Sequence, residues 1–196
     1  MPLLKLWNAI RGRSANGQPA DQGPASEPPV TTQTKMSNRG SRLGIFASGP
    51  HAALCKQLES VSASSILEIS VDDGSRAVAV LETITKNNKN VRYLAIDQFE
   101  MAAGAVTLKR FHQTLRAKEF RPQVIPETME RGLIRVSHTI GTVDLVLIAA
   151  PLETWQTPQF LPLLSRVTHQ GTMVLFRDEQ QTWKELSTPA PTRRAA

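Results

Sequence analysis

Short aliphatic and β-branched runs alternate with longer segments of helical periodicity along the middle of this chain. Five such runs occupy residues 65–69, 91–96, 123–125, 143–149 and 172–176. Successive runs lie far enough apart for a covering helix, which is the connection that neighbouring parallel strands require. The pattern therefore predicts an α/β protein with a doubly wound, mainly parallel five-stranded sheet and helices on both faces.

The segments between these runs carry apolar residues at helical spacing, so each helix would present one apolar face to the sheet. Their apolar positions are Ala77, Val78, Leu81 and Ile84; Leu108, Phe111 and Leu115; Met129, Leu133, Val136 and Ile140; and Phe160, Leu163, Leu164 and Val167. A further helix is expected over about 50–61. The runs at 65–69 and 144–149 are almost continuously apolar, which indicates the centre of the sheet.

Composition divides the chain into three parts. Residues 1–44 are rich in Gly, Pro, Ser, Thr, Gln and Asn, which predicts a disordered N-terminal arm. A short amphipathic helix is expected within it at 3–11, where apolar residues recur beside Lys5 and Arg11 and could dock on a membrane surface or a protein. The α/β domain is expected over 45–177, and 178–196 are interpreted as a flexible tail.

Charge and cysteine content restrict the class of protein. The formal net charge is +6, but residues 1–44 hold six Lys and Arg against two acids, so most of the excess lies outside the predicted domain. This distribution argues against a nucleic-acid-binding surface. No apolar run approaches the roughly 20 residues of a membrane span. The single cysteine, Cys55, cannot form an internal disulfide and indicates a reducing, cytoplasmic location. The histidines are scattered, so no metal site is predicted.

The acidic turn after the first predicted strand carries the clearest motif. The stretch ILEISVDDGSR at 66–76 resembles motif I of the class I S-adenosylmethionine-dependent methyltransferases, a Rossmann-like superfamily. Glu68 matches the acid of that motif, and Gly74 matches the last glycine of its GxGxG turn. In open parallel sheets, ligands bind at this end of the strands.

Later segments extend the resemblance to about residues 50–177. Asp97 ends the second strand 23 residues after Gly74, where the superfamily places an acid on the ribose hydroxyls. Glu127 follows the third strand, where the superfamily contacts adenine. The resemblance thus implies S-adenosylmethionine as cofactor, held by a set of residues from three strand ends: Glu68, Ser70, Asp72, Gly74, Asp97 and Glu127.

The motif is degenerate at two positions. Ser70 and Asp72 replace the first two motif glycines, so side chains stand where backbone would approach the methionine part of the cofactor. Asp72 and Asp73 also suit capping of the following helix, because acids are favoured near free N–H groups. A Rossmann dehydrogenase is the nearest rival, but its GxGxxG pattern would need a glycine at Ser75.

No catalytic residue is predicted. The stretch AAPL at 149–152 ends the fourth strand and offers neither an acid, an amide nor a metal ligand. Asp144, at the start of that strand, would stabilise a turn. Two functions remain: an S-adenosylmethionine-binding methyltransferase-like protein with an unknown small-molecule or protein acceptor, or a catalytically inactive binding or scaffolding module. The apparent lack of a terminal antiparallel hairpin favours the second.

Overall fold

The computed structural model describes residues 49–186. The predicted N-terminal arm, its amphipathic helix at 3–11 and the last ten residues of the predicted tail lie outside these residues. Within 49–186, no helix is both long enough and apolar enough to cross a membrane.

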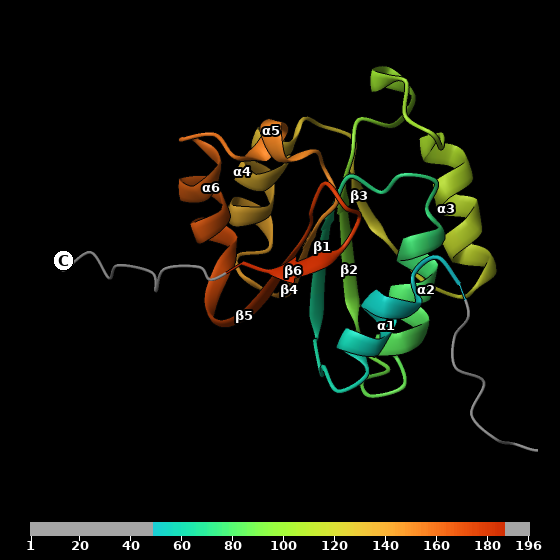
Figure 1. Cartoon of the computed structure of the whole chain (residues 1–196). Coiled ribbons are helices and arrows are strands. Elements are labelled where there is room, and N and C mark those ends of the chain that lie inside the picture. The colour runs from blue at the N-terminus through green and yellow to red at the C-terminus, as the bar shows by residue number, and fades with distance from the viewer. Residues whose placement is uncertain (1–48, 187–196) are drawn as a thin grey trace, which may run out of the picture. The chain divides into compact units, whose positions relative to one another are not determined.

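The described residues form one six-stranded sheet (Figure 1). Its strands are β1 (Ser65–Ile69), β2 (Arg92–Ile96), β3 (Gln123–Ile125), β4 (Val143–Ile148), β5 (Thr168–Arg177) and β6 (Trp183–Glu185). They lie in the order β3-β2-β1-β4-β5-β6, with β1 to β5 parallel and β6 antiparallel to β5. The predicted doubly wound parallel arrangement is confirmed, and β6 is an additional strand that the sequence pattern did not predict.

Helices cover both faces of the sheet, as the apolar spacing predicted. They are α1 (Ala52–Leu58), α2 (Ser75–Ile84), α3 (Leu108–Ala117), α4 (Met129–Thr139), α5 (Leu152–Trp155) and α6 (Phe160–Val167), with a 3-10 turn, η1 (Phe99–Ala102). The first three lie on one face and the last three on the other (Figure 1). Successive residues of β1 alternate between the two cores: Ile66 packs under α1 to α3, whereas Leu67 packs under α4 to α6.

The C-terminal segment corrects the predicted domain boundary. Residues 178–186 were expected to belong to a flexible tail, but they form a tight turn and the strand β6. The Asp178 carboxylate accepts a hydrogen bond of 2.8 Å from the Thr182 N–H, and Leu186 N–H donates to the Val174 carbonyl at 2.8 Å. Trp183 is buried in the core. An antiparallel hairpin is therefore present, and its supposed absence no longer favours a scaffolding role.

The order of the strands fixes where a ligand site can lie. The chain runs outward from β1 through β2 to β3, then crosses back to β4 on the other side of β1. This reversal between β1 and β4 opens a crevice at the carboxyl ends of the strands. The turn from β1 into α2 borders the crevice, as do the segments after β2, β3 and β4.

Candidate functional site

The turn between β1 and α2 has an unusual backbone. Ser70, Asp72 and Gly74 have φ angles of 64°, 53° and 83°, in the left-handed region that costs a non-glycine residue about 1–2 kcal/mol. A Cβ atom on Gly74 would also lie 2.9 Å from Cδ2 of the buried Phe111 ring. Glycine is required at position 74 for both reasons. Ser70 and Asp72 adopt backbone angles that favour glycine, so other contacts of the turn must stabilise them.

Glu68 does not face a ligand. Its side chain is fully buried. Oε1 accepts a hydrogen bond of 2.8 Å from Arg76 Nε, and Oε2 accepts one of 2.5 Å from the Tyr93 hydroxyl. Burial raises the pKa of Glu68, and these two partners oppose the shift. Glu68 was predicted at the cofactor; in the structure its carboxylate is bound by Arg76 and Tyr93 inside the protein.

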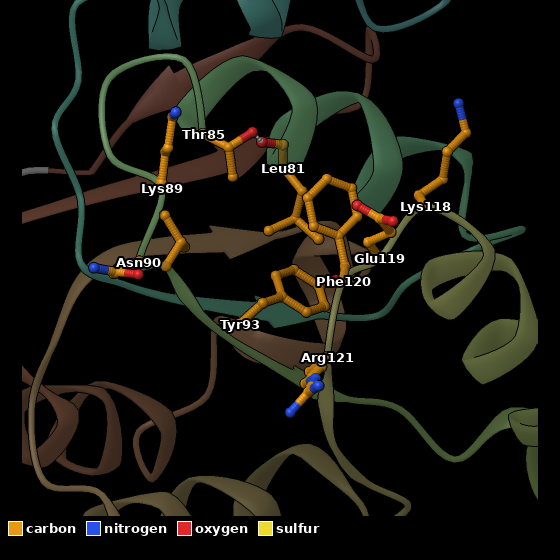
Figure 2. Close-up of a pocket in the computed structure, with 10 residues that line it drawn as sticks. Leu81, Thr85, Lys89, Asn90, Tyr93, Lys118, Glu119, Phe120 and Arg121 are labelled. Atoms are coloured by element: carbon orange, nitrogen blue, oxygen red, sulfur yellow. Dashed lines mark hydrogen bonds between the residues drawn. The ribbon is translucent and has the colours of Figure 1, made fainter.

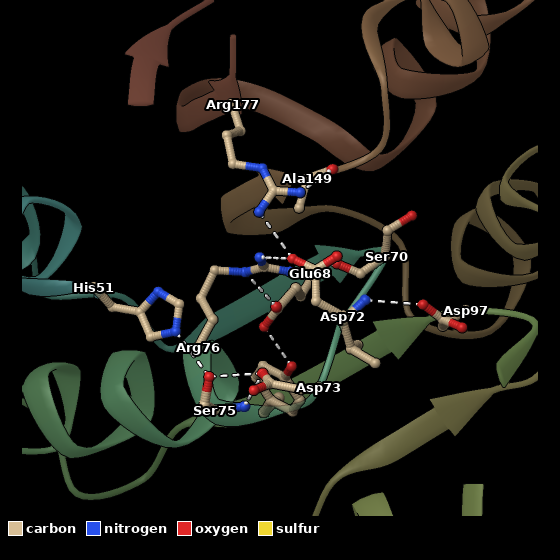
Figure 3. Close-up of polar contacts among 12 residues, drawn as sticks. His51, Glu68, Ser70, Asp72, Asp73, Ser75, Arg76, Asp97, Ala149 and Arg177 are labelled. Carbon is tan, nitrogen blue, oxygen red and sulfur yellow. Dashed lines mark hydrogen bonds and ion pairs between the residues drawn. The ribbon is translucent and has the colours of Figure 1, made fainter. Parts of the chain in front are cut away.

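Asp72 also pairs with protein cations (Figure 3). Its Oδ2 accepts a hydrogen bond of 2.6 Å from Arg76 Nη1 and another of 2.9 Å from Arg177 Nη1. Arg76 Nη2 donates to the Ser70 carbonyl, and Arg177 Nη2 donates to the Ala149 carbonyl at 3.0 Å. These contacts join the carboxyl ends of β1, β4 and β5. The predicted role of Asp72 at the cofactor has no support in this arrangement.

Arg76 is the centre of this network, and the sequence reading missed it. The side chain is 1% exposed, and its guanidinium carbon lies 5.5 Å from the centroid of the Trp183 ring. A cation packed on an aromatic face is favourable when it is shielded from water. The available signal was an arginine eight residues after Glu68 at the start of an apolar helix, where a buried acid needs a partner.

The helix-capping prediction is confirmed for Asp73. Asp73 Oδ1 accepts hydrogen bonds from Ser75 N–H at 2.9 Å and from Ser75 Oγ at 2.6 Å, and these bonds lower the pKa of Asp73. His51 Nε2 lies 2.9 Å from Ser75 Oγ, which joins α1 to the same turn. The two neighbouring aspartates therefore have different tasks: Asp73 supports the first turn of α2, and Asp72 binds guanidinium groups.

Three of the six predicted site residues line one cleft of about 240 Å³ at the carboxyl ends of β1, β2 and β4: Ser70, Asp97 and Glu127. The side chains of Glu68 and Asp72, together with Gly74, lie outside the lining of this cleft. Apolar walls come from Ile96, Phe99, Met129 and Ala150, among others. The structure therefore brings together the acids that follow β2 and β3, as the resemblance implied.

Asp97 is held firmly by backbone donors. Its Oδ2 accepts a hydrogen bond of 2.9 Å from the Val71 N–H, and its Oδ1 accepts one of 2.5 Å from the Phe99 N–H. Each carboxylate oxygen can accept more than one hydrogen bond, so Asp97 keeps acceptor positions for a ligand hydroxyl. Glu127 is half-buried and lies 3.2 Å from Arg131 Nε, one helical turn later. The cleft thus presents two oriented carboxylates beside an apolar wall.

The cleft fits one half of S-adenosylmethionine better than the other. A volume of 240 Å³ lies below the roughly 300–1,000 Å³ typical of sites that enclose drug-sized ligands, so it suits a nucleoside-sized group. A nucleoside also offers hydroxyls and an apolar ring face to the acids and the wall. The amino-acid half would meet Ser70 and the paired Asp72. The residues present fit an adenosyl group, and in this conformation they leave no glycine-lined path for the rest.

A second cavity of about 290 Å³ adjoins the first at Ala150. It lies between the ends of β4 and β5, and Pro151, Glu153 and Arg177 contribute to its lining. Position 149, where a catalytic acid or amide would be needed, is an alanine that supplies only its carbonyl. Within residues 49–186, no three His, Cys, Asp or Glu side chains gather as a metal site. The carboxylate that this part of the lining does supply comes from Glu153, which follows the AAPL stretch.

The strand order and this cleft define a doubly wound, Rossmann-like α/β domain. No protein-family model matches the sequence, and no curated protein matches it. Several solved structures that are similar to the chain are methyltransferases. One from Podospora anserina, bound to S-adenosylhomocysteine, is 15% identical with a TM-score of 0.49, over 64% of this chain and 50% of that chain.

Two further solved structures show the same level of similarity. An S-adenosylmethionine-dependent methyltransferase from Agrobacterium tumefaciens is 13% identical with a TM-score of 0.48, over 64% of this chain and 42% of that chain. A putative protein-L-isoaspartate O-methyltransferase from Plasmodium falciparum is 14% identical with a TM-score of 0.49, over 71% of this chain and 70% of that chain. The chain spans half or less of the length of the first two.

Proposed function

We propose that this domain binds the adenosyl group of S-adenosylmethionine or S-adenosylhomocysteine in the cleft at the ends of β1, β2 and β4. The observation that supports this function best is the shared lining of one cleft by Asp97 and Glu127, which follow adjacent strands. Asp97 would accept hydrogen bonds from the ribose hydroxyls, and Glu127 would contact the base. The apolar side chains of Ile96 and Met129 would cover the faces of the adenine ring.

Bound S-adenosylmethionine would supply an activated methyl group, and the acceptor would be a small molecule or a protein. The residues of this chain would bind and orient the nucleoside. Since AAPL at 149–152 provides no proton acceptor, proximity and orientation would carry most of the rate of any transfer. The single cysteine is buried and free, in keeping with a reducing cytoplasmic compartment.

Calorimetric titration of the full chain with S-adenosylhomocysteine and with adenosine tests this proposal. We expect both ligands to bind, and millimolar ligand to raise the unfolding temperature by several degrees. Asp97→Asn and Glu127→Gln should each weaken binding about tenfold, because each removes a charged acceptor. Asp73→Asn is the matched control: it makes the same change of charge in the turn after β1, outside the lining of the cleft. The absence of any response at millimolar ligand would refute adenosyl binding.

One observation favours a second candidate, a binding or scaffolding module that has lost its cofactor. The ion pairs from Asp72 to Arg76 and Arg177 fasten the turn after β1 across the ends of β4 and β5. A turn held in this way would keep the amino-acid half of the cofactor out. The same titrations separate the candidates, since a module without cofactor would respond neither to the nucleoside nor to S-adenosylhomocysteine.

A further inference from the structure

A cavity larger than the cleft lies elsewhere in the described part of the chain. It measures about 630 Å³ and sits where the end of α2, the residues before β2 and the segment after α3 meet (Figure 2). These residues border the amino end of β2, whereas the cleft lies at the carboxyl ends of the strands. The cavity is more than twice the volume of the cleft and within the range of small-molecule sites.

The floor of this cavity is apolar and aromatic. Leu81 and Tyr93 are almost fully buried, and Phe120 is half-buried. Figure 2 shows the rings of Tyr93 and Phe120 close together at its centre, with Leu81 beside them. Phe120 therefore provides most of the ring surface that is still open to water here, and a flat apolar group that covers it would gain roughly 25 cal/mol per Å² of surface removed from water.

The rim of the cavity is cationic. Lys89, Lys118 and Arg121 contribute to its lining, against the single acid Glu119. Lys118 is engaged by Glu82 at 2.9 Å, but Lys89 and Arg121 pair with no acid among residues 49–186. These two exposed side chains lie on opposite sides of the aromatic floor (Figure 2). Unpaired cations around an apolar hollow attract and orient an anion.

We propose that this cavity is a second binding site, for a small molecule with a flat apolar body and one anionic group. The apolar body would lie on Phe120, which Tyr93 supports from below, and the anion would contact Lys89 or Arg121. Charge selects against the chain's own N-terminal residues as the occupant, because residues 1–44 carry six cations against two acids. This inference stands independently of adenosyl binding, since the two sites share no lining residue.

Fluorescence titration of the full chain with 1-anilinonaphthalene-8-sulfonate tests the proposal, because this probe is an anion with a flat apolar body. N-phenyl-1-naphthylamine, which has the same body without the sulfonate, is the neutral comparison. We expect the anionic probe to bind saturably with one site per chain, and the neutral probe to bind at least about tenfold more weakly.

Two double variants test the role of the rim. Lys89→Gln with Arg121→Gln should weaken binding of the anionic probe about tenfold and leave the affinity of the neutral probe unchanged. Lys86→Gln with Arg116→Gln makes the same change of charge at exposed positions outside the cavity. It should leave the affinity for each probe within about twofold of the wild-type value. Equal loss in the two double variants would show attraction by net charge alone and would overturn the proposal, as would the absence of saturable binding.

A third variant locates the probe without removing charge. Asn90→Trp places a large ring at the exposed edge of the cavity, and it should abolish binding of the anionic probe while the urea midpoint stays unchanged. Undiminished binding in Asn90→Trp would place the probe elsewhere and would also overturn the proposal.

Discussion

The hydroxyl of Tyr93 donates a 2.5 Å hydrogen bond to the fully buried carboxylate of Glu68. Burial raises the pKa of both groups. The opposite oxygen of Glu68 accepts from Arg76, so one acid links the floor of the larger cavity to the turn beside the cleft. The stability of this chain of contacts can be measured one partner at a time.

Tyr93→Phe removes the hydroxyl and leaves one buried oxygen of Glu68 without its donor. An unsatisfied buried acceptor costs about 1–3 kcal/mol, so we expect the free energy of unfolding to fall by this amount in urea titrations. Phe99→Leu trims a buried ring that has no part in the hydrogen bonds of Glu68 and is the packing control. An unchanged urea midpoint for Tyr93→Phe would show that water replaces the lost donor.

Arg76→Met should be strongly destabilising, because it leaves Glu68 buried without its cationic partner. Breaking a buried ion pair from one side costs about 3–5 kcal/mol. Adding Glu68→Gln removes the stranded charge while keeping an acceptor for Tyr93. The double variant should therefore be more stable than Arg76→Met alone, as measured by urea denaturation of all four species. Additive losses would mean that the two side chains do not act as a pair.

Gly74→Ala tests the strained turn. An alanine there has both an unfavourable positive φ of 83° and a Cβ 2.9 Å from Phe111. Gly141→Ala is a matched control, with a similar φ of 88° and no atom within 4 Å of the added Cβ. We expect Gly141→Ala to lose about 1–2 kcal/mol and Gly74→Ala to lose more, by thermal or urea unfolding. Equal losses would show that Phe111 moves aside freely.

Asp144 should make stability depend on acid pH. Burial alone would raise its pKa, but hydrogen bonds from Ser64, His169 and Ser65 outweigh burial and lower the pKa of Asp144. A folded-state pKa below the unfolded value of about 3.9 means that the stabilisation is present above that pH. It is lost as the pH falls through the lower folded value.

Urea unfolding of the wild type and Asp144→Asn at several pH values measures this effect. The wild type should be the more stable at pH 7, and the difference should shrink steadily below about pH 4. A difference that stays constant down to pH 2 would assign the loss to packing. Asp178→Asn is a comparison outside this cluster, since Asp178 pairs with Lys184 at the other end of β5.

Much of the fold could be predicted because periodicity reports burial. The apolar runs located β1 to β4 closely, and helical spacing located α2, α3, α4 and α6. The pattern missed the true start of β5 at Thr168, because His169 and Gly171 interrupt its apolar character. It missed β6 because a three-residue edge strand has too few residues to show alternation; only the buried Trp183 marked it.

The site was predictable where a residue ends a strand and less so where side chains compete for partners. Asp97 and Glu127 follow β2 and β3, so strand positions alone brought them to one cleft. Asp144 was correctly expected to stabilise a turn: it accepts from the backbone N–H groups of Ser64 and Ser65. Glu68 and Asp72 were expected at a ligand, but in the structure their carboxylates pair with arginines of the protein. The contact between Asp72 and Arg177 spans 105 residues, and no local pattern links these two positions.

The Trp183 indole lies against the Arg76 guanidinium, so the last hairpin helps to decide where this domain ends. A chain truncated after Arg177, where the composition turns polar, would keep all five parallel strands and still uncover the guanidinium at their centre. Water would then compete for the charge that holds the first strand to its helix. We therefore expect the folded domain to need the chain through Glu185, so that a three-residue strand at one edge of the sheet protects the charge at its centre.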